Sequence, residues 1–496
     1  MPSVTVKGEN KGMGNLLATK PLEQLMQESQ ETGEHSLRRA LGPINLLTLG
    51  IGAIIGAGIF VITGQAAAQF AGPAIVFSFI LAGIACAFAG LCYAEFASMI
   101  PVAGSAYTYS YATLGELVAW IIGWDLVLEY AFGAASVAVG WSGHLRAFLH
   151  DVGMDLPPIP HADIVFFGKP VHVTFDYIGF LVIMAITTIL VIGIKESANF
   201  TAAVVVLKVA VVCVFIALAS AFLLSHNFKP NYWHPFIPKN TGEFGTFGIS
   251  GIFRGAGVVF FAYIGFDAVS TAAQESKNPK KDMPFAILGS LVICTVLYIL
   301  VSGLLTHLVP YTQLNVPDPV VVGMRATGQQ WATFLVELGA LLGLATVMLV
   351  MLLGQSRVFY SMSRDGLLWP WAGKIHPRFR TPYLSSIVVG VFVAILATLL
   401  PLNVLDQMTS IGTLLAFVLV SAGVWVMRRT HPDTPRSFRT PWVPVVPILA
   451  ILFSGALIVT LPTATQIRLV VWLIVGLFIY FFYGRKHSKV QKSLRG

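Results

Sequence analysis

The chain has 496 residues, of which 56% are hydrophobic and only 11% are charged, and its mean hydropathy is +0.78. Soluble globular chains carry about 25% charged residues, so this chain lacks the charge to cover the surfaces of several water-soluble domains. This argues against soluble enzymes, nucleic-acid-binding proteins and disordered scaffolds, despite the net charge of +8. The composition indicates a polytopic membrane protein.

Twelve apolar segments are long enough to cross a membrane, because a spanning helix needs about 20 predominantly apolar residues. Residues 1–42, which precede them, are polar and have neither the apolar core nor the cleavage site of a signal peptide. We expect a solvated tail with a short amphipathic helix near Leu22 to Met26. The predicted spans one to twelve are residues 43–64, 72–100, 116–145, 175–194, 199–224, 248–273, 284–308, 331–358, 383–401, 404–427, 443–462 and 466–483.

Lysine and arginine are distributed unevenly between the two sides of this bundle. With the N-terminus placed in the cytoplasm, the cytoplasmic segments hold 23 of the 31 basic residues and the external segments hold six. The other two, Lys208 and Arg254, fall inside predicted spans. Because cytoplasmic loops are the ones enriched in Lys and Arg, both termini are predicted to be cytoplasmic. The positive net charge therefore reports topology and does not indicate a nucleic-acid partner.

Cysteine and histidine give no sign of covalent or metal chemistry. The four cysteines lie in predicted spans, so we expect buried apolar side chains and no disulfide-linked heavy chain. The 11 histidines have no metal-ligand spacing, and no catalytic or nucleotide-binding motif occurs. We therefore expect neither an enzyme, nor a metal site, nor a cofactor. The cysteines are Cys86, Cys92, Cys213 and Cys294.

The first span contains four glycines in nine positions, Gly50, Gly52, Gly56 and Gly58. Each weakens a helix by about 1 kcal/mol relative to Ala. A run this dense at mid-depth indicates unwinding, which lipid tolerates only where the backbone lines a protein cavity; the alternative is a glycine seam for tight helix packing. Unwinding frees main-chain amides, which suit a carboxylate, and main-chain carbonyls, which suit an ammonium group. The segment therefore favours a site for a zwitterionic α-amino acid.

The sixth span has a matching irregularity. Its stretch from Val259 to Asp267 is rich in aromatic residues and contains Gly265 and an acidic residue at mid-helix. Spans one and six are corresponding members of two five-helix halves, the pattern expected of transporters built from inverted repeats. The sequence thus predicts that the two spans share one site.

These segments resemble the amino acid–polyamine–organocation superfamily, and most of all the bacterial twelve-span type of its cationic amino acid transporter branch. The resemblance covers about residues 35–485. It is carried by the motifs Gly52 to Phe60, Cys92 to Phe96 with Pro101 and Ser105 to Tyr109, Gly123 to Tyr130, Phe261 to Asp267, Glu275 to Pro284 and Arg364 to Leu368.

The resemblance implies an all-α, LeuT-like fold of two inverted five-helix repeats, with spans one and six unwound and spans eleven and twelve added. It also implies amino acid transport coupled to protons rather than sodium. The predicted organisation is a cytoplasmic tail (1–42), a first repeat (43–225), an external loop (226–247), a second repeat (248–428), spans eleven and twelve (441–484) and a cytoplasmic tail (485–496).

The resemblance also assigns roles to individual residues. The main-chain amides of Ala57 and Gly58, next to Gly56, would hold the substrate carboxylate. Position 57 is Ser or Thr in many relatives, so we expect no side-chain contact from Ala57. The Phe261 side chain would act as a lid on the outward side of the substrate. The main-chain carbonyls that would meet the substrate ammonium are those of Ile54, Phe261, Ala262 and Ile264.

Lys208 lies midway along span five, too deep to reach either membrane surface easily. An unpaired ammonium at this depth costs at least about 3 kcal/mol, so the group must be paired, bonded to carbonyls or deprotonated. In the family that the chain resembles, a lysine here takes the place of a sodium ion. We hypothesise that Lys208 bridges spans one, five and eight when charged and releases the unwound segment when neutral. The alternative is a static structural ion.

Other charged residues inside the spans have weaker assignments. Asp125 and Glu129 are four residues apart and share one helix face. Glu129 matches an acid near the substrate region of relatives and is a candidate for the proton path, whereas Asp125 is expected to order helix packing. For Asp267 a gating role and a helix-capping role both stay open. Arg254 is expected to anchor the outer mouth at the membrane interface.

Substrate choice depends on span eight. By resemblance, Met351 aligns with a position that is smaller in arginine-carrying animal relatives, so a methionine would shorten the pocket; the alternative is ordinary apolar packing. No acid is clearly placed to hold a guanidinium group. We therefore expect proton-coupled symport of small neutral amino acids such as alanine.

Two alternatives stay open at this point. The chain could instead carry or exchange cationic amino acids or polyamines, or it could be a membrane sensor that binds an amino acid without transporting it. An ion channel is disfavoured because the sequence has no repeated filter-like segment. The sequence also leaves open whether a small single-span helper subunit packs against the outer helices.

Overall fold

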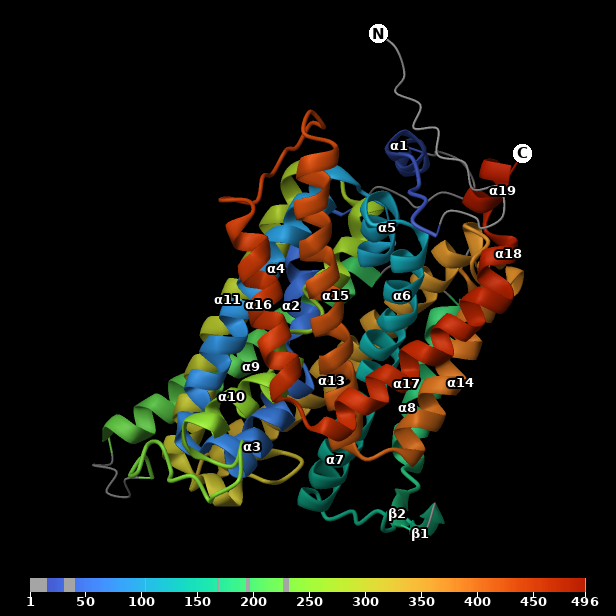
Figure 1. Ribbon diagram of the computed structural model, residues 1–496. Helices are drawn as coiled ribbons and strands as arrows, with labels where there is room; N and C mark the ends of the chain where they lie inside the picture. The colour runs from blue at the N-terminus through green and yellow to red at the C-terminus, as the bar shows by residue number, and fades with distance from the viewer. Residues whose placement is uncertain are drawn as a thin grey trace.

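The first and last helices of the chain, α1 (Leu22–Gln30) and α19 (Lys489–Arg495), lie at one end of a helical bundle, and a short β-hairpin lies at the other (Figure 1). We call these the terminal end and the hairpin end. The computed structural model describes residues 16–30, 41–102, 104–166, 169–192, 197–225, 232–379 and 381–495. Much of the predicted N-terminal tail, and the loop residues Lys195, Lys229 and Arg380, lie outside the described residues.

The first half of the bundle holds spans one to five. A short helix, α1 (Leu22–Gln30), precedes it where the sequence predicts an amphipathic helix. Span one is divided into four pieces, α2 (Pro43–Ile54), η1 (Gly58–Ile62), α3 (Thr63–Ala66) and η2 (Ala67–Ala71). The remaining elements of this half are η3 (Gly72–Ala74), span two α4 (Ile75–Met99), α5 (Ser105–Thr113), span three α6 (Glu116–Val127), η4 (Leu128–Phe132) and α7 (Gly133–Asp151), strands β1 (His161–Phe166) and β2 (Lys169–Thr174), span four α8 (Tyr177–Ile192) and span five α9 (Ser197–Ser225).

The second half repeats the plan with another broken first helix. Span six consists of α10 (Gly248–Val259), η5 (Phe260–Tyr263) and η6 (Asp267–Glu275). The elements that follow it are span seven α11 (Pro279–Leu308), η7 (Tyr311–Gln313), α12 (Pro319–Arg325), span eight α13 (Gln330–Arg364), η8 (Pro370–Gly373), span nine α14 (Tyr383–Leu399) and span ten α15 (Leu402–Thr430).

Spans eleven and twelve follow the two halves and complete the bundle. They are α16 (Val445–Thr460) and α17 (Thr463–Ile479), and the chain ends with η9 (Tyr480–Gly484), α18 (Arg485–His487) and α19 (Lys489–Arg495). Among the described residues, eight segments are long and apolar enough to cross a membrane; the first holds spans one and two, and three shorter apolar helices bring the total to the twelve predicted spans. The structure is the predicted LeuT-like arrangement of five plus five plus two helices.

Three details differ from the expectations. Strands β1 and β2 form an antiparallel hairpin between spans three and four, in a chain predicted to be all-helical. Span seven begins at Pro279 rather than residue 284, because a proline fits the first position of a helix well. Cys213 is exposed on α9 rather than buried; an apolar thiol is compatible with the lipid-facing side of a span. The other three cysteines are buried as expected.

The motif around Glu95 holds the terminal end of the bundle together. The buried Glu95 carboxylate accepts hydrogen bonds from Arg428 Nε at 2.8 Å, Arg436 Nε at 3.1 Å and the Thr440 amide at 2.8 Å. A buried carboxylate needs several such donors. The motif residue Glu95 thus fixes span two to the end of span ten and the segment that follows it.

Candidate substrate site

Span one leaves the α-helical path at the glycine run. Helix α2 ends at Ile54, the backbone of Ile55 is extended (φ −73°, ψ 99°), and the π-helical η1 begins at Gly58. Helix breaks leave the last carbonyls of one piece and the first amides of the next without partners in the helix. The predicted break in the first span is therefore present, and it exposes both kinds of main-chain group at mid-span.

Span six breaks at the corresponding place. Piece η5 ends at Tyr263, Ile264 is extended (φ −60°, ψ 136°), and Gly265 has φ +114° before η6 begins at Asp267. A Cβ atom added to Gly265 would lie 2.8 Å from the Ala53 Cβ and 2.9 Å from the Ala53 carbonyl oxygen. Only glycine satisfies both the backbone angle and this close approach to span one.

The two breaks lie against each other. A Cβ atom on Gly58 would be 2.3 Å from the Cα of Ala262, so the backbones of the two spans touch at this point. The structure therefore brings together all seven residues that the sequence assigns to the substrate main chain, and all seven are buried. These residues are Ile54, Gly56, Ala57, Gly58, Phe261, Ala262 and Ile264.

Lys208 binds directly to the unwound segment of span one. Its Nζ donates to the Gly52 carbonyl at 2.5 Å and to the Ile55 carbonyl at 2.9 Å, and it lies 3.3 Å from the Thr346 hydroxyl of span eight. The side chain is fully buried. An ammonium group has three donors, and these three acceptors use all of them. Lys208 thus contacts spans one and eight from span five.

Tyr298 of span seven occupies two of the carbonyls assigned to the substrate ammonium. Its hydroxyl lies 2.8 Å from the Ile54 carbonyl and 2.8 Å from the Ala262 carbonyl. The third, the Phe261 carbonyl, accepts the Ile264 amide at 3.2 Å. Each carbonyl has two lone pairs, so each retains one acceptor position for a ligand. Tyr298 therefore ties the two breaks together without exhausting their capacity to accept hydrogen bonds.

A second polar group, next to the break in span six, contains two carboxyls that lie close together. Glu129 and Asp267 interact electrostatically, neither Glu129 oxygen has a hydrogen-bond partner among the described residues, and Asp267 Oδ2 accepts a hydrogen bond from the Tyr130 hydroxyl at 3.0 Å. Two neighbouring buried carboxyls repel each other when both are ionised, and one proton on the pair removes that repulsion. Glu129 and Asp267 therefore link spans three and six through a group that can hold a proton.

The other two intramembrane charges lie elsewhere. Asp125 approaches Gly412 of span ten, where an added Cβ would be 3.3 Å from Oδ1, and neither oxygen has a hydrogen-bond partner among the described residues. Arg254 lies at the hairpin end, with Nε 3.4 Å from the Thr460 carbonyl and the guanidinium over the Phe244 ring. The structure places neither residue at the two breaks.

Met351 forms part of a wall between spans three, eight and ten. A Cβ atom on Gly133 would lie 2.8 Å from the Met351 sulfur and 3.2 Å from the Thr409 methyl group. Val347, one turn before Met351 on α13, packs against the break in span one: a Cβ atom on Gly56 would lie 2.8 Å from the Val347 side chain. Gly133 is four residues after Glu129, so Met351 packs on span three about one turn away from Glu129.

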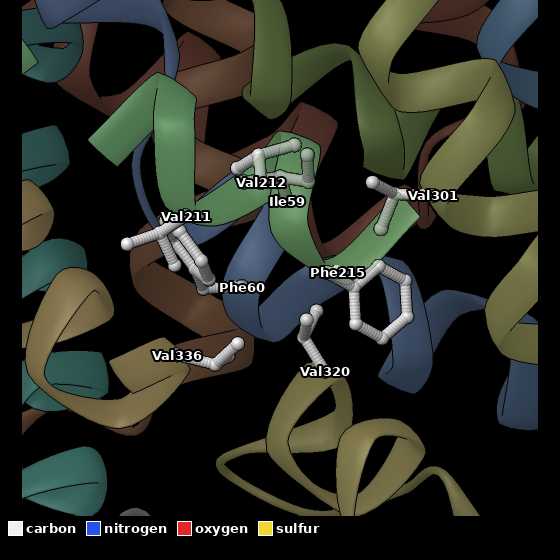
Figure 2. Close-up of a pocket in the computed structure, with 8 residues that line it drawn as sticks. All are labelled: Ile59, Phe60, Val211, Val212, Phe215, Val301, Val320 and Val336. Atoms are coloured by element: carbon white, nitrogen blue, oxygen red, sulfur yellow. The ribbon is translucent and has the colours of Figure 1, made fainter. Parts of the chain in front are cut away.

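Next to the half of span one that follows the break is a crevice without polar groups. Figure 2 shows side chains from spans one, five, seven and eight and from α12 converging on it. The crevice is too narrow to admit water, and its lining has no group that could bind a carboxylate or an ammonium. This crevice therefore offers a zwitterionic substrate no polar partner, unlike the two breaks. The lining residues are Ile59, Phe60, Val211, Val212, Phe215, Val301, Val320 and Val336.

Sequence reasoning missed several residues of the site. Tyr298 had one detectable signal, a lone phenol in the middle of an otherwise apolar span, of the kind that needs a hydrogen-bond partner when buried. Thr346, Gly133 and Thr409 gave no signal, because small residues are common in membrane helices. Their importance becomes visible only when the helices are packed.

Comparison with known proteins identifies similar chains. A family model described as amino acid permease matches residues 41–484. The chain is 47% identical to the branched-chain amino acid permease BcaP of Bacillus subtilis (strain 168), over 97% of this chain and 100% of that protein. It is 44% identical to the methylthioribose transporter of the same organism, again over 97% and 100%. It is 32% identical to the vacuolar cationic amino acid transporter 4 of Arabidopsis thaliana, over 93% and 94%.

Because the two breaks pack closely, adding one methyl group at Gly58 should destabilise the protein. Gly58→Ala should lower the free energy of unfolding by about 1–3 kcal/mol, the usual range for overpacking, because the new Cβ collides with the Ala262 backbone. Thermal unfolding of the detergent-solubilised protein measures the loss.

Gly455→Ala in α16 is the matched control. No atom lies within 4 Å of a Cβ at that position, so the higher helix propensity of Ala should maintain or raise the melting temperature. Equal melting temperatures for Gly58→Ala and the unmodified protein would contradict the contact between the breaks.

Proposed function

The chain belongs to the amino acid permease family of the amino acid–polyamine–organocation superfamily, and on this premise we propose that it is a proton-coupled symporter of small neutral L-amino acids such as alanine. It is a multi-pass membrane transporter and not an enzyme. The observation that carries the proposal is the contact between Lys208 and the broken span one.

The substrate main chain is proposed to bind between the two breaks. The amides of Ala57 and Gly58 sit at the start of η1, where free N–H groups and the helix dipole favour a carboxylate. The ammonium would meet the carbonyls of Ile54, Phe261, Ala262 and Ile264 at the free acceptor position of each. Phe261, which is 4% exposed, is proposed to cover the substrate from the outward side.

Lys208 is proposed to couple substrate movement to protons. The protonated side chain satisfies three acceptors on spans one and eight. The neutral amine has one donor fewer and directs a lone pair at an acceptor oxygen, so its hold on span one is weaker. The group would thereby play the part that a bound cation plays in other transporters, with no sodium ion required.

The contacts that span the bundle support alternating access. We propose that spans one, two, six and seven rock against spans three, four, eight and nine. At the terminal end, three contacts hold span six to span three, to span eight and to α5, and they would have to break for the site to open there. They are the Tyr130–Asp267 hydrogen bond, the Ser270–Ser105 hydrogen bond at 2.7 Å and the Arg357–Glu275 ion pair at 2.5 Å.

The distribution of basic residues supports a cytoplasmic location for the terminal end. The segments assigned to this end hold 23 lysines and arginines against six for the hairpin end. Under the positive-inside rule this orientation puts both termini in the cytoplasm of a cell whose plasma or inner membrane carries the transporter. Opening of the three contacts named above would then release substrate into the cytoplasm.

Two other substrate classes are second candidates, each favoured by one observation. The 47% identity to BcaP, a branched-chain amino acid permease, favours larger aliphatic substrates. Glu129, one turn from the Gly133 on which Met351 packs, favours cationic ones, since a carboxyl group could pair with a cationic substrate side chain. The bulk of Met351 against Gly133 supports alanine over both, because it shortens the space available to the substrate side chain.

An uptake panel tests the proposal as a whole. Proteoliposomes with an acidic exterior should accumulate labelled alanine, and a protonophore should abolish the accumulation, because the proton gradient is its energy source. The panel includes leucine, arginine, putrescine and methylthioribose. Faster uptake of any of these would overturn the choice of alanine, and binding of alanine without accumulation would indicate a sensor instead.

The role of Lys208 has its own test. Lys208→Gln keeps a hydrogen-bond donor but removes the exchangeable charge, so it should reduce pH-driven alanine accumulation by at least about tenfold, a loss of roughly 1.4 kcal/mol of driving force. Lys374→Gln, at an exposed lysine, is the matched control and should behave as the unmodified protein does. Full proton-driven accumulation by Lys208→Gln would refute the coupling role.

The wall at Met351 predicts a gain of function. Met351→Ser removes the sulfur that packs on Gly133 and opens a path to Glu129, so arginine uptake should appear. Met362→Ser is the control, because this methionine packs on Gly123 of the same two spans, away from the breaks. Unchanged selectivity in Met351→Ser, with the protein folded and active on alanine, would remove Met351 from the substrate pocket.

A further inference from the structure

We propose that the hairpin end carries a second, peripheral site for a zwitterionic amino acid, in a surface cavity between the last turns of α7 and the segment that leads into α12. This inference rests on the proposed function, because it takes the transported amino acid as the ligand. The cavity has a volume of about 430 Å³, within the range of small-molecule sites. Its lining includes Gly143, Arg146, His150, Asp155, Pro317 and Asp318.

Arg146 supplies the cationic wall of this cavity. Its Nη1 donates to the Pro157 carbonyl at 2.7 Å, and its guanidinium carbon lies 5.4 Å from the centre of the Tyr177 ring. Its Nε and Nη2 are shielded from solvent and have no acceptor among the described residues. Buried N–H groups normally have a partner, and a guanidinium prefers a planar carboxylate. A carboxylate in the cavity would satisfy these donors when the guanidinium turns toward it.

Asp318 supplies the anionic wall. It is 7% exposed, and it shares Arg325 with two other carboxylates. Arg325 Nη2 contacts Asp151, lies 2.9 Å from Glu337 and reaches Asp318 only at 3.9 Å. Burial raises the pKa of the Asp318 carboxyl, and Arg325 opposes that rise. One guanidinium does not balance three carboxylates, so Asp318 can accept a further cation.

Arg146 and Asp318 carry opposite charges and line the same cavity, but they do not contact each other. Among the described residues, Arg146 forms no ion pair with Asp318 or with Asp155, the second acid of the lining. A ligand with a carboxylate and an ammonium group can contact both walls at once, whereas a simple anion or cation can satisfy only one. The cavity therefore favours a zwitterion over either kind of ion.

The position of the cavity links it to the central site. Pro317 packs on α7, where a Cβ on Gly143 would lie 2.7 Å from it. The next residues, Pro319 and Val320, cover the outer half of span one, since a Cβ on Gly64 would be 2.2 Å from Pro319 and Val320 lines the apolar crevice (Figure 2). A ligand in the cavity would thus contact the same segment that covers span one. It would be bound next to the proposed path into the central site.

Equilibrium dialysis of the purified full chain in detergent counts the sites. Labelled L-alanine and, in parallel, labelled L-leucine are titrated into the unmodified protein, Arg146→Gln, Ala147→Phe and Lys239→Gln. The unmodified protein should bind two equivalents of the transported amino acid. Arg146→Gln should weaken one of them by about tenfold or more, because it removes a charge-assisted hydrogen bond, and leave the other unchanged.

Ala147→Phe fills the cavity, which Ala147 lines, without touching the Arg146 donors, and should remove the same equivalent if Arg146→Gln folds poorly. Lys239→Gln removes an exposed charge that does not line the cavity and should keep both equivalents. One equivalent in the unmodified protein, or two in Ala147→Phe, overturns the peripheral site alone. No binding of either amino acid by the unmodified protein, with no uptake in liposomes, overturns the proposed function as well.

Discussion

The organisation of this transporter depends on one constraint: main-chain polar groups at mid-membrane depth must find partners inside the protein. The glycine run of span one interrupts the helix and leaves the carbonyls of Gly52, Ile54 and Ile55 without helical partners. Lys208 donates to two of them and Tyr298 lies at the third. These donors allow a broken helix to exist in a lipid environment, and the break in turn provides the free amides and carbonyls of an amino acid site.

The two donors differ in a way that matters for movement. Tyr298 belongs to span seven, which is proposed to move with span one, so its hydroxyl can stay between the Ile54 and Ala262 carbonyls through a transport cycle. Lys208 belongs to span five and also contacts Thr346 of span eight, so it joins the broken segment to the other side of the bundle. A tyrosine keeps its proton at physiological pH, whereas a buried amine can lose one. In the proposed mechanism, the fixed contact and the switchable contact are thus on different spans.

The sequence alone predicted the two breaks and the importance of Lys208, because both depart locally from the rule that a membrane-spanning segment is a continuous apolar helix. Four glycines in nine positions weaken a helix wherever it packs, and an ammonium at mid-depth needs partners whatever its neighbours are. It did not reach the Glu129–Asp267 contact or the packing of Met351 on Gly133, because these depend on the rotation and register of separate helices, which apolar spans leave unspecified. The β1–β2 hairpin was missed for a related reason, since attention to span length ignores short strands in a loop.

The geometry gives deprotonation the same direction of effect at both broken spans. At span one, a neutral Lys208 has two donors for three acceptors, so one contact to the break is lost. At span six, ionisation of both Glu129 and Asp267 would create repulsion between two neighbouring carboxylates. The first change loosens span one from spans five and eight, and the second loosens span six from span three. If both groups release protons in one cycle, the two broken spans are freed together, and this supplies a physical reason for a site that is divided between them to open as a unit.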